Sequence, residues 1–544
     1  MNKLKVGIDL GTTTTLVAVT ELDAESLIPF GKTRKLVFDG SDNFPFLDSI
    51  SWFSRSRSDN PVVGYSAKLN GPLDPDGLVV RDIKREMGKQ APPIVWGDKE
   101  YAPPLISSLY IENVLSGAGI DSGDIEYLTV TVPASFTSTQ RKDTKAAVNL
   151  ALERIGLSAS SSGDNQFNGL ISEPLAALIS FVSEDLKNGT RDGGKCQIDY
   201  SSDNGNRILV YDLGGGTLDL TVVALPLKNK QSPVDLNNID WKIEKIGRYN
   251  ETGGTDCDHI FAKEILDHLL KQHSDVAQHN LSENEANSLK AILLNAGEKM
   301  KLAFNGAYAD YEEKFSFSPE LLIQGKKYEV DLSMSTEDAK GLLSPLLGNQ
   351  DSDYFKPVKE LFSSDYPLKD VDFVLCVGGM THLSYLQNKV TEILDTKSLI
   401  VRHRQDAVAK GAAIYSELRS QGEVIKEPAS DDYYIHTNSG FKKVLSRNDF
   451  DNHTETKHHL ADRSDHLKLR IFAGEESDTD PLLTHKLSSL VYQGGENLSL
   501  GSFYDKGTEV IVRMKFSGLD KIPEVQVEIN NEVKSDWALL DNRE

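Results

Sequence analysis

The residues best suited to chemistry form a short motif near the start of the chain. Residues 6–15 read VGIDLGTTTT, in which an apolar run ends at Asp9, before Gly11 and four threonines. The segments on both sides of this tip are strand-like in length and β-branched content, so a β-hairpin is predicted over residues 4–19. A tip rich in backbone N–H groups suits an anion such as phosphate, although an ordinary polar turn would have a similar composition.

A second copy of this motif lies further along the chain. Residues 207–223 read RILVYDLGGGTLDLTVV, and the spacing from Asp9 to Asp212 is 203 residues. Gly214 and Thr217 then align with Gly11 and Thr14, so a whole strand–turn–strand unit is repeated. Two such tips facing each other would hold a polyphosphate from both sides, and the two aspartates would hold hydrated Mg²⁺.

Composition limits the class of protein. The chain has 544 residues, of which 39% are hydrophobic and 26% charged, as in a soluble protein of roughly three to four domain-sized units. No run approaches the ~18 apolar residues of a membrane span, and the N-terminus shows no signal-peptide pattern, so a cytoplasmic location and no membrane partner are expected. The net charge of −23 argues against nucleic acid as a partner. The three cysteines fit a reducing compartment.

One segment comes close to a different phosphate-binding loop. Residues 189–196 read GTRDGGKC, which approaches the G-x-x-x-x-G-K-[ST] pattern. The segment ends in Cys196 and follows a polar stretch with no strand leading into it. We therefore interpret it as a surface loop.

The two hairpins resemble the phosphate loops of the actin-like ATPase superfamily. Within that superfamily, their amino-acid sequences are most similar to those of the 70-kDa heat-shock protein family of chaperones. The resemblance covers residues 1–418. It implies a two-lobed α/β, actin-like (ribonuclease H-like) ATPase domain with mixed sheets and a central nucleotide cleft. It also implies ATP/ADP and Mg²⁺ as cofactors, with Asp9 and Asp212 holding the metal through water. The phosphates would be held by Gly11, Thr12, Thr13, Gly214, Gly215 and Gly216.

Two further motifs would supply catalytic residues. RDIKREMGK (81–89) resembles the family segment with a catalytic lysine, here Lys84, which would place a charge on the γ-phosphate and orient the attacking water. In ISEPLAALISF (171–181) the resemblance assigns Glu173 to the catalytic cluster, together with Asp212 and Thr217. By pattern alone, Lys84 is a lysine on a helix surface and Glu173 is a good helix start before proline, and this second reading of Glu173 is compatible with catalysis.

A long segment between these two motifs resembles the family's relay to its partner domain. LTVTVPASFTSTQRKDTKAAVNLALERIGL (128–157) reads as a buried strand, a proline turn and a helix. The resemblance implies that Pro133 and Arg141 transmit the nucleotide state.

The remaining motifs would surround the γ-phosphate and the nucleoside. ETGGTDCDHIFAKEIL (251–266) resembles a third phosphate turn with Gly253 and Gly254, although Thr255 stands where the family usually has an acid. NAGEKMKLAFN (295–305) resembles the helix that holds adenine and ribose through Glu298 and Lys301. Spacing alone would make these two an ordinary i,i+3 ion pair.

The segments expected to surround the nucleoside also depart from the family pattern. Leu302 follows Lys301, and Asn305 replaces a serine of the family. FVLCVGGMTHLSYLQNKV (373–390) reads as strand, turn and helix; Gly378 and Gly379 would approach the α-phosphate and adenosine, and His382 stands where many relatives have an arginine against adenine. RQDAVAKGAAIYSEL (404–418) resembles the helix that closes the ATPase domain.

A different pattern begins after residue 418. Residues 419–432 are polar and contain Pro428, so they are predicted to be a linker in which only Val424 and Ile425 match the family's apolar linker. From residue 433 to 544, alternating segments at 467–472, 509–516 and 524–529 predict a small all-β sandwich domain. This part weakly resembles the family's peptide-binding β-domain. The residues up to Glu544 are too few for its helical lid, so a divergent, lidless member is expected.

These features favour an ATP-dependent, chaperone-like protein that hydrolyses ATP slowly and couples hydrolysis to binding of extended polypeptide. The resemblance implies unfolded or extended polypeptide clients, a J-domain co-chaperone and a nucleotide exchange factor as partners. A second hypothesis is a regulatory relative that binds nucleotide, hydrolyses little and acts as a partner of another protein; Thr255, His382, the reduced linker and the missing lid favour it. A small-molecule kinase would need a sugar pocket and would not predict the β-sandwich.

Overall fold

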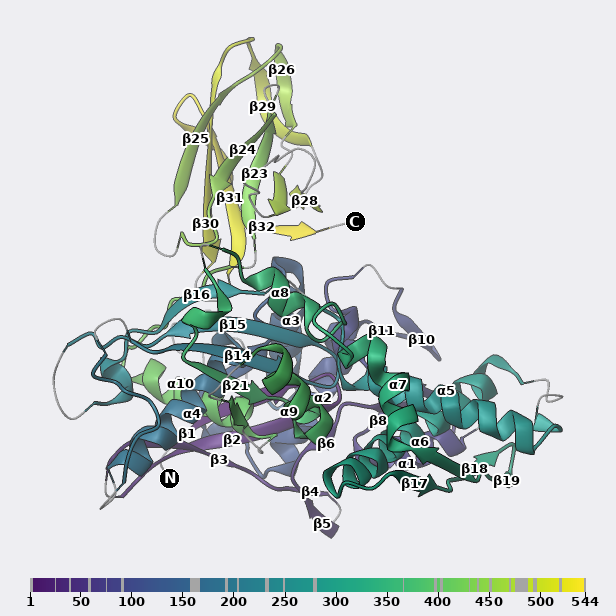
Figure 1. Ribbon diagram of the computed structural model, residues 1–544. Helices are drawn as coiled ribbons and strands as arrows, with labels where there is room; N and C mark the ends of the chain where they lie inside the picture. The colour runs from purple at the N-terminus through teal and green to yellow at the C-terminus, as the bar shows by residue number, and fades with distance from the viewer. Residues whose placement is uncertain are drawn as a thin grey trace. The chain divides into compact units, whose positions relative to one another are not determined.

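A computed structural model of the chain forms two compact units (Figure 1). The first consists of Met1–Arg85, Pro93–Ala134 and Ala147–Val424, and the second of Glu86–Pro92, Ser135–Ala146 and Ile425–Glu544. The structure describes residues 3–24, 26–38, 41–56, 60–74, 76–89, 92–156, 167–190, 194–202, 205–229, 234–247, 250–276, 281–364, 366–395, 399–401, 405–429, 431–437, 440–449, 453–468, 471–474, 488–492, 497–517 and 521–542.

The first predicted hairpin is confirmed and forms the middle of a sheet. Strand β1 (Leu4–Leu10) pairs antiparallel with β2 (Thr14–Leu22), which places Asp9 opposite Leu16. The sheet order is β13–β12–β1–β2–β3, with β6 also paired to β2. β1, β12 and β13 run parallel, whereas β2 and β3 are antiparallel to their neighbours. The added strands are β3 (Pro29–Thr33), β6 (Leu47–Asp48), β12 (Ile125–Val132) and β13 (Phe167–Ser172).

The second predicted hairpin lies in a sheet of the same topology. Strands β14 (Arg207–Leu213) and β15 (Leu218–Ala224) pair antiparallel, and the sheet order is β16–β15–β14–β21–β22. β16 (Lys242–Ile246) is antiparallel to β15, whereas β21 (Phe373–Val377) and β22 (Leu399–Val401) continue parallel to β14. The order and directions match those of the first sheet, so the sequence repeat is a repeat of topology.

Two helices pack between these sheets. Helix α10 (Ala407–Ser420) packs on β1, β2, β3 and β12, while α4 (Glu173–Gly189) contacts β14, β15 and α10 (Figure 1). Glycines permit this close approach, because a Cβ atom on Gly411 would lie 1.6 Å from the carbonyl oxygen of Ala176. A Cβ on Gly7 would similarly lie 2.1 Å from the amide nitrogen of Ala413. The first residues of α4 and α10 are thereby fixed beside the tips of the hairpins.

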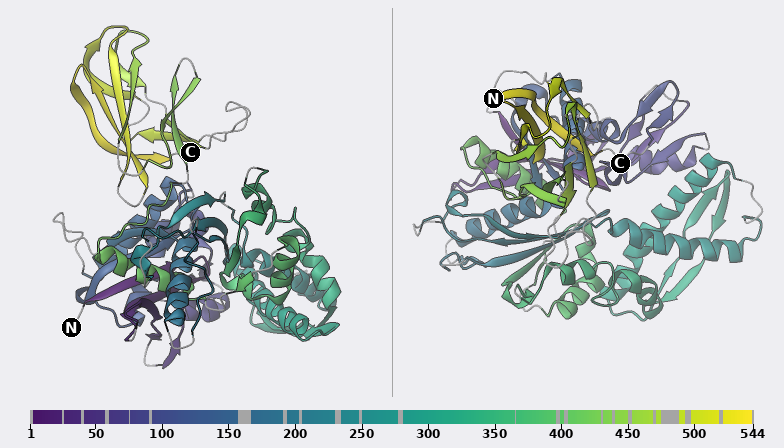
Figure 2. Two further views of the ribbon diagram at one scale, coloured as in Figure 1. Left: turned by 60° about the vertical axis from the view of Figure 1, so that its left-hand side comes forward. Right: turned by 90° about the horizontal axis from the view of Figure 1, so that it is seen from above.

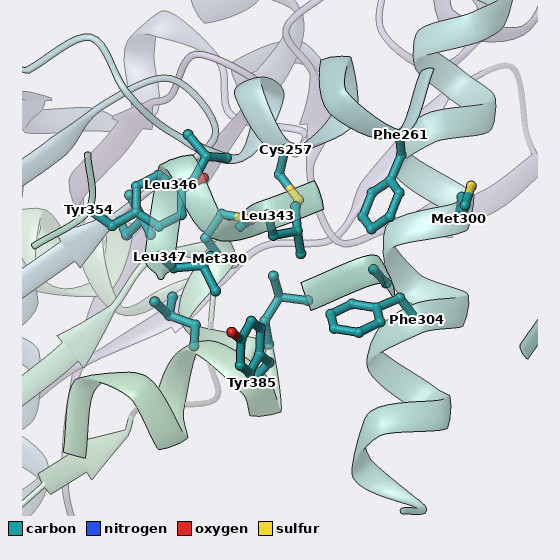
Figure 3. Close-up of a cluster of buried hydrophobic side chains, with 14 of the residues drawn as sticks. Cys257, Phe261, Met300, Phe304, Leu343, Leu346, Leu347, Tyr354, Met380 and Tyr385 are labelled. Atoms are coloured by element: carbon teal, nitrogen blue, oxygen red, sulfur yellow. The ribbon is translucent and has the colours of Figure 1, made fainter. Parts of the chain in front are cut away.

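A larger apolar cluster supports the other side of the first unit. Helices α5 (Gly254–Gln272) and α6 (Glu283–Ala309) lie side by side (Figure 2). Their Phe261 and Phe304 rings have centroids 6.1 Å apart and belong to a cluster that also holds side chains from α7 (Thr336–Leu347), η7 (Gly379–His382) and α9 (Ser384–Ile393) (Figure 3). The cluster reaches Leu209 and Tyr211 of β14, so α5 and α6 are anchored to the second sheet.

Further helices and strands lie before residue 425. Within the described ranges, none of the helices has the length and apolar character that a membrane span requires. The remaining elements are β4 (Leu36–Phe38), β5 (Ser41–Phe44), β7 (Ser51–Phe53), β8 (Val62–Val63), α1 (Tyr65–Asn70), η1 (Gly71–Leu73), β9 (Leu78–Val80), η2 (Ile83–Glu86), β10 (Ile94–Trp96), β11 (Lys99–Tyr101), α2 (Pro103–Gly117), η3 (Ser122–Asp124), α3 (Ser138–Arg154), η4 (Leu236–Asn238), β17 (Lys314–Phe317), β18 (Glu320–Ile323), β19 (Lys326–Glu329), β20 (Leu332–Ser335), α8 (Lys356–Leu361) and η6 (Leu368–Asp370).

The second unit contains antiparallel strands. One sheet has the order β24–β23–β27–β28–β32–β31–β30–β25, and β26 pairs separately with β29. On β30 buried and partly exposed residues alternate, and the buried ones, such as Val512 and Met514, join Tyr433 in an apolar core. The strands are β23 (Asp432–Thr437), β24 (Gly440–Leu445), β25 (Thr454–His459), β26 (Ser464–Lys468), β27 (Ile471–Gly474), β28 (Ser488–Tyr492), β29 (Asn497–Tyr504), β30 (Glu509–Ser517), β31 (Ile522–Ile529) and β32 (Glu532–Asn542).

Several predicted segments differ from the structure in detail. The expected single strand over 467–472 is divided between β26 and β27, because β26 pairs with β29 whereas β27 pairs with β23 and β28. α10 continues to Ser420, so the first residues of the predicted linker are helical. The near match to a phosphate loop begins at Gly189, the last residue of α4, and its residues 191–193 lie outside the described ranges.

Candidate functional site

A cavity in the first unit collects side chains from both hairpin tips. Its walls come from η2, from the first residues of α4, α5 and α10, and from α6 and η7. Of the residues predicted to bind nucleotide or metal or to catalyse, only Gly253 does not line it, and Gly253 directly precedes a lining residue. The predicted residues that line it are Asp9, Gly11, Thr12, Thr13, Lys84, Glu173, Asp212, Gly214, Gly215, Gly216, Thr217, Gly254, Glu298, Lys301, Gly378, Gly379 and His382.

Glycines of the second hairpin tip touch threonines of the first. A Cβ atom on Gly215 would lie 2.3 Å from Cγ2 of Thr13, and one on Gly216 would lie 2.4 Å from Oγ1 of Thr12. Side chains at either glycine would therefore force the tips apart. The close contact brings the backbones of both tips to one end of the cavity, where they form a cradle of small residues suited to phosphate.

The third glycine-rich turn is joined to the second tip by hydrogen bonds. The amide of Gly254 donates to the carbonyl of Gly214 at 2.9 Å, and the amide of Thr255 donates to that of Gly215 at 2.8 Å. The hydroxyl of Tyr354 donates to the carbonyl of Gly253 at 2.8 Å and holds the turn from behind. Because α5 begins at Gly254, the positive end of its dipole adjoins the same cradle.

A buried ion pair adjoins the cradle. Lys84 on η2 donates to Oε1 of Glu173, and their side chains are only 5% and 11% exposed. Glu173 is the first residue of α4 and Pro174 follows it, so the helix start is a favourable place for the carboxylate. Glu173 therefore both starts helix α4 favourably and lines the cavity. In this setting Lys84 is held as a fixed positive charge inside the cavity.

Two further carboxylates at this end carry unusual pKa values. Burial, and then the charge of Glu173, raise the pKa of Asp9 to about 7, while Lys84 and a hydrogen bond from Thr131 oppose the shift. Burial, together with the charges of Glu173 and neighbouring aspartates, also raises the pKa of Asp212 well above its ordinary value. Within the described chain, Oδ2 of Asp212 is buried and has no hydrogen-bond partner. A group of crowded carboxylates with an unsatisfied oxygen fits a cation.

The donor set of this cavity suits hydrated Mg²⁺ better than a metal held entirely by protein. Among the described residues there is no group of three or more histidines, cysteines and acids placed to hold a metal ion. Mg²⁺ commonly binds through one or two carboxylates and completes its shell with water and phosphate oxygens. Asp9 and Asp212 fit this requirement.

The segment 81–85 connects several walls of the cavity. The sequence predicted a role in the site only for Lys84 among its residues. Arg85 donates from Nε to the carbonyl of Gly216 at 2.9 Å and from Nη2 to Asp256 at 3.0 Å. At its other end, Arg81 donates to Oδ1 of Asn295 on α6 at 2.6 Å. The segment therefore ties the turn that carries Lys84 to the second tip, to α5 and to α6.

The far end of the cavity is lined by α6 and η7. Glu298 and Lys301 of α6 do not pair with each other, although their spacing would allow it. Lys301 instead lies 2.7 Å from Asp258 of α5. Exposed Leu302 and partly buried Asn305 continue the same helix face, and His382 contributes from η7. This end therefore combines charged, apolar and neutral polar groups, as a nucleoside site requires.

Lys68 joins two opposite walls and was missed by sequence reasoning. Its Nζ lies 2.9 Å from Oε2 of Glu298 on α6 and 3.1 Å from Oδ1 of Asp48 on β6. Burial lowers the pKa of Lys68, but the charges of Asp48 and Glu298 raise it above its ordinary value overall. The ammonium group therefore stays charged at neutral pH and links α1 with α6. Lys68 belongs to the segment PVVGYSAKL (61–69), which precedes the catalytic-lysine motif, but no local pattern identifies its partner.

Comparison with known proteins identifies related sequences. The chain matches the family model described as Hsp70 protein over residues 5–481. The "Chaperone protein DnaK" of Ureaplasma urealyticum serovar 10 is 28% identical over 416 residues, which cover 75% of this chain and 57% of that protein. The "Chaperone protein DnaK" of Thermoplasma volcanium is 26% identical over 435 residues, or 79% of this chain and 60% of that protein. The matches thus cover less than two thirds of the length of these curated relatives.

Proposed function

Because the chain belongs to the Hsp70 protein family, we propose that its first unit binds ATP with Mg²⁺ in the cavity and hydrolyses it slowly to ADP and phosphate. The observation that carries this proposal is the buried Lys84–Glu173 pair, which lies beside Asp9 and Asp212 at the cradle formed by both tips. We further propose that the nucleotide state alters how the chain binds extended polypeptide, as a chaperone. A J-domain co-chaperone and a nucleotide exchange factor are the proposed partners of this cycle.

In this mechanism the cradle binds and orients the triphosphate. Backbone N–H groups of Gly11–Thr13, Gly215 and Gly216 donate to phosphate oxygens, while Gly214 closes its own turn by donating to the carbonyl of Thr217 at 3.0 Å. The start of α5 adds its partial positive charge. Asp9 and Asp212 would hold Mg²⁺ through water, and the metal would neutralise charge on the phosphates. These donors are in place before binding, so little reorganisation accompanies the reaction.

Lys84, Glu173 and Thr217 then act on the reacting groups. Lys84, held in place by Glu173, presents a fixed positive charge to the oxygens of the γ-phosphoryl group. Glu173 accepts a hydrogen bond from the attacking water and so orients its oxygen, while the hydroxyl of Thr217 positions the same end of the substrate. The pair excludes bulk solvent from this position because both side chains are buried.

A specific feature favours a second candidate function. Thr255, which stands where relatives usually have an acid, directs its hydroxyl toward Oδ1 of Asp82 at 3.5 Å and offers no charge to the cavity. A regulatory relative that binds nucleotide but hydrolyses little, and acts as a fixed partner of another protein, would need the cradle but not full catalysis.

Single-turnover ATP hydrolysis distinguishes these functions. We expect Lys84→Ala to lower the rate by roughly a hundredfold or more, the effect of removing one preorganised charge, while ATP still raises the melting temperature. Lys89→Ala serves as the matched control, because Lys89 is an exposed lysine that pairs with Glu86. Wild-type protein that binds ATP tightly without turnover would favour the regulatory function. Absence of ATP binding would overturn both.

The polypeptide part of the proposal needs its own measurement. Full-length chain is titrated with an unfolded, fluorescently labelled model polypeptide in the presence of ATP or ADP. We expect binding in both states with affinities that differ at least severalfold, since coupling between sites is commonly 1–3 kcal/mol or about 5- to 150-fold. Equal affinities would reject coupling, and no binding would reject the chaperone activity.

A further inference from the structure

Two fully buried tyrosines lie behind the cradle. Tyr211 directly precedes Asp212 on β14, and successive side chains of a strand point to opposite faces. Tyr211 therefore joins the apolar core, while Asp212 lines the cavity. Tyr354 lies between α7 and α8 in the same core (Figure 3), where its amide donates to the carbonyl of Leu346 at 2.9 Å. Neither tyrosine lines the cavity, so a bound nucleotide would not touch them.

Two hydrogen bonds connect these tyrosines to the third glycine-rich turn. The hydroxyl of Tyr211 donates to the backbone carbonyl of Tyr354 at 2.8 Å. The hydroxyl of Tyr354 in turn donates to the carbonyl of Gly253 at 2.8 Å. A continuous chain of bonds through the core therefore joins the strand that carries Asp212 to the turn at which α5 begins.

The end of this chain at Gly253 is determined from two directions. Its carbonyl also accepts from the amide of Asp256 at 3.1 Å, so both of its lone pairs are used. Burial is the first cause that raises the pKa of Tyr211 and of Tyr354 well above their ordinary values. Both hydroxyls therefore keep their protons at neutral pH and remain donors.

The turn is in direct contact with the second hairpin tip. The amides of Gly254 and Thr255 donate to carbonyls of that tip at 2.9 and 2.8 Å. A Cβ atom on Gly253 would lie 2.6 Å from the carbonyl oxygen of Gly215, so no side chain separates the two backbones. A small displacement of the turn would therefore move both the tip and the start of α5.

We propose that Tyr354, supported by Tyr211, is a positioning residue for ATP hydrolysis. Its hydroxyl fixes the turn at Gly253 relative to the strand of Asp212, so the start of α5 and this carboxylate stay aligned on the γ-phosphoryl group. Binding of ATP uses many donors and depends less on this alignment than the reaction does. The inference rests on the proposed hydrolysis of ATP and adds to it two residues outside the cavity.

The variant Tyr354→Phe tests the bond to Gly253, because it removes the hydroxyl and keeps the ring. We expect single-turnover hydrolysis to slow about tenfold, since a misplacement of about 1 Å can cost roughly a hundredfold and the turn keeps its other bonds. The dissociation constant of ATP, measured by calorimetry, should stay within about twofold of wild type, and the melting temperature within a few degrees. An unchanged rate, or a loss of ATP affinity as large as the loss of rate, would overturn the proposal.

Tyr328→Phe is the matched control for this variant. Tyr328 is buried in the same apolar cluster, but its hydroxyl donates to Asp275 at 3.1 Å, outside the cavity lining. Loss of this hydroxyl should leave the rate of hydrolysis as it is in wild type. An equal slowing in Tyr328→Phe would show that any buried hydroxyl of the core has the same effect, which would overturn the specific role of Tyr354.

A double variant tests whether the two tyrosines act in series. Tyr211→Phe should slow hydrolysis about threefold, because Tyr354 then loses one of its supports. Once the bond from Tyr354 to Gly253 is absent, the position of Tyr354 no longer reaches the turn. The double variant should therefore be no slower than Tyr354→Phe, whereas a slowing equal to the product of the two single effects would overturn the chain.

Hydrogen exchange reports on the turn without relying on turnover. Amide exchange over residues 251–256 is measured by mass spectrometry on the full chain with ATP. We expect exchange about three- to tenfold faster in Tyr354→Phe than in wild type, the usual effect of losing one hydrogen bond, and no change in Tyr328→Phe. Equal exchange in Tyr354→Phe and wild type would overturn the proposal, because the hydroxyl would then not hold the turn.

The outcomes separate this inference from the proposed function. If wild type hydrolyses ATP and Tyr354→Phe does so at the same rate, the positioning role is wrong while the proposed function stands. If wild type binds ATP without turnover, or does not bind it, the proposed hydrolysis is wrong and both proposals are overturned.

Discussion

Replacing Lys68 by methionine tests whether the bridge between α1 and α6 slows the release of nucleotide. The change removes the ammonium group and keeps most of the apolar stem. Asp48 lies on the same side of the cavity as α1, so of the two ion pairs of Lys68 the one with Glu298 spans the two walls. The backbone carbonyl of Lys68 also accepts from Nδ2 of Asn295 on α6 at 3.2 Å, a contact that the substitution keeps. If the walls must separate before ADP leaves, this contact is broken in the transition state for release.

The size of the effect follows from the exposure of the pair. Lys68 is 24% exposed and Glu298 is 40% exposed, so solvent screens their attraction and its contribution is at most about 1 kcal/mol. Since 1.36 kcal/mol corresponds to a factor of ten, release should accelerate roughly three- to fivefold in Lys68→Met. A larger effect would mean that Lys68 also contacts the nucleotide.

The assay is stopped-flow displacement of a fluorescent ADP at low and high salt. Salt should accelerate release from wild type and have less effect on Lys68→Met, because the screened charge is already absent. Lys326→Met is the matched control, since Lys326 pairs with Asp275 on the surface outside the cavity lining. Equal release rates for wild type and Lys68→Met, or the same salt dependence in both, would refute the reasoning.

Three further predictions concern stability, pH and turnover. Gly411→Ala should lower the free energy of unfolding of the first unit by about 3 kcal/mol or more in denaturant, because its Cβ would lie 1.6 Å from the carbonyl oxygen of Ala176. The control is Gly306→Ala on α6, where a Cβ meets open space; it should raise the free energy of unfolding by roughly 0.5–1 kcal/mol. Without nucleotide or Mg²⁺, Asp9→Asn should melt higher than wild type by an amount that grows between about pH 4 and pH 7, because the pKa of Asp9 is raised from 3.8 to about 7 by folding and wild type loses stability as pH rises through this window. A pH-independent difference would contradict the raised pKa. Arg85→Lys keeps the charge but cannot make both contacts, with Gly216 and with Asp256. Single-turnover ATP hydrolysis should therefore slow about tenfold with little change in ATP affinity. An unchanged rate would show that Arg85 does not position the second tip.

Local sequence patterns predicted the parts of the site that depend on neighbouring residues. The apolar runs around Asp9 and Asp212 define their hairpins, and the sharp change to glycine and threonine marks each tip. Glu173 before proline similarly identifies the start of α4. Such features are read from a few consecutive residues, because backbone preferences and side-chain periodicity act over that range.

Contacts between distant segments were not predictable in this way. Nothing in the sequence near Lys68 indicates that Glu298 lies opposite, and the spacing of Glu298 and Lys301 favours a different pair. The hydrogen bond from Ser384 to Asn305 likewise joins two elements 79 residues apart. These partners depend on how α1, α6 and α9 pack, and that packing is determined by the whole apolar cluster rather than by the residues that meet.

The charges at the cradle explain why the phosphate donors that we propose are mainly backbone groups. When Asp9, Glu173 and Asp212 are all ionised, three carboxylates face the single ammonium group of Lys84 at this end, which leaves a net charge that one divalent cation would balance. Additional lysines would pair with these acids, as Lys84 does with Glu173, and each pair would leave an ammonium group fewer N–H donors for phosphate. Backbone N–H groups and the start of α5 carry no net charge, so they bind phosphate without competing for the carboxylates. The stability of the folded chain should therefore rise with Mg²⁺ and nucleotide together more than with either alone, because each neutralises the charge that opposes the other.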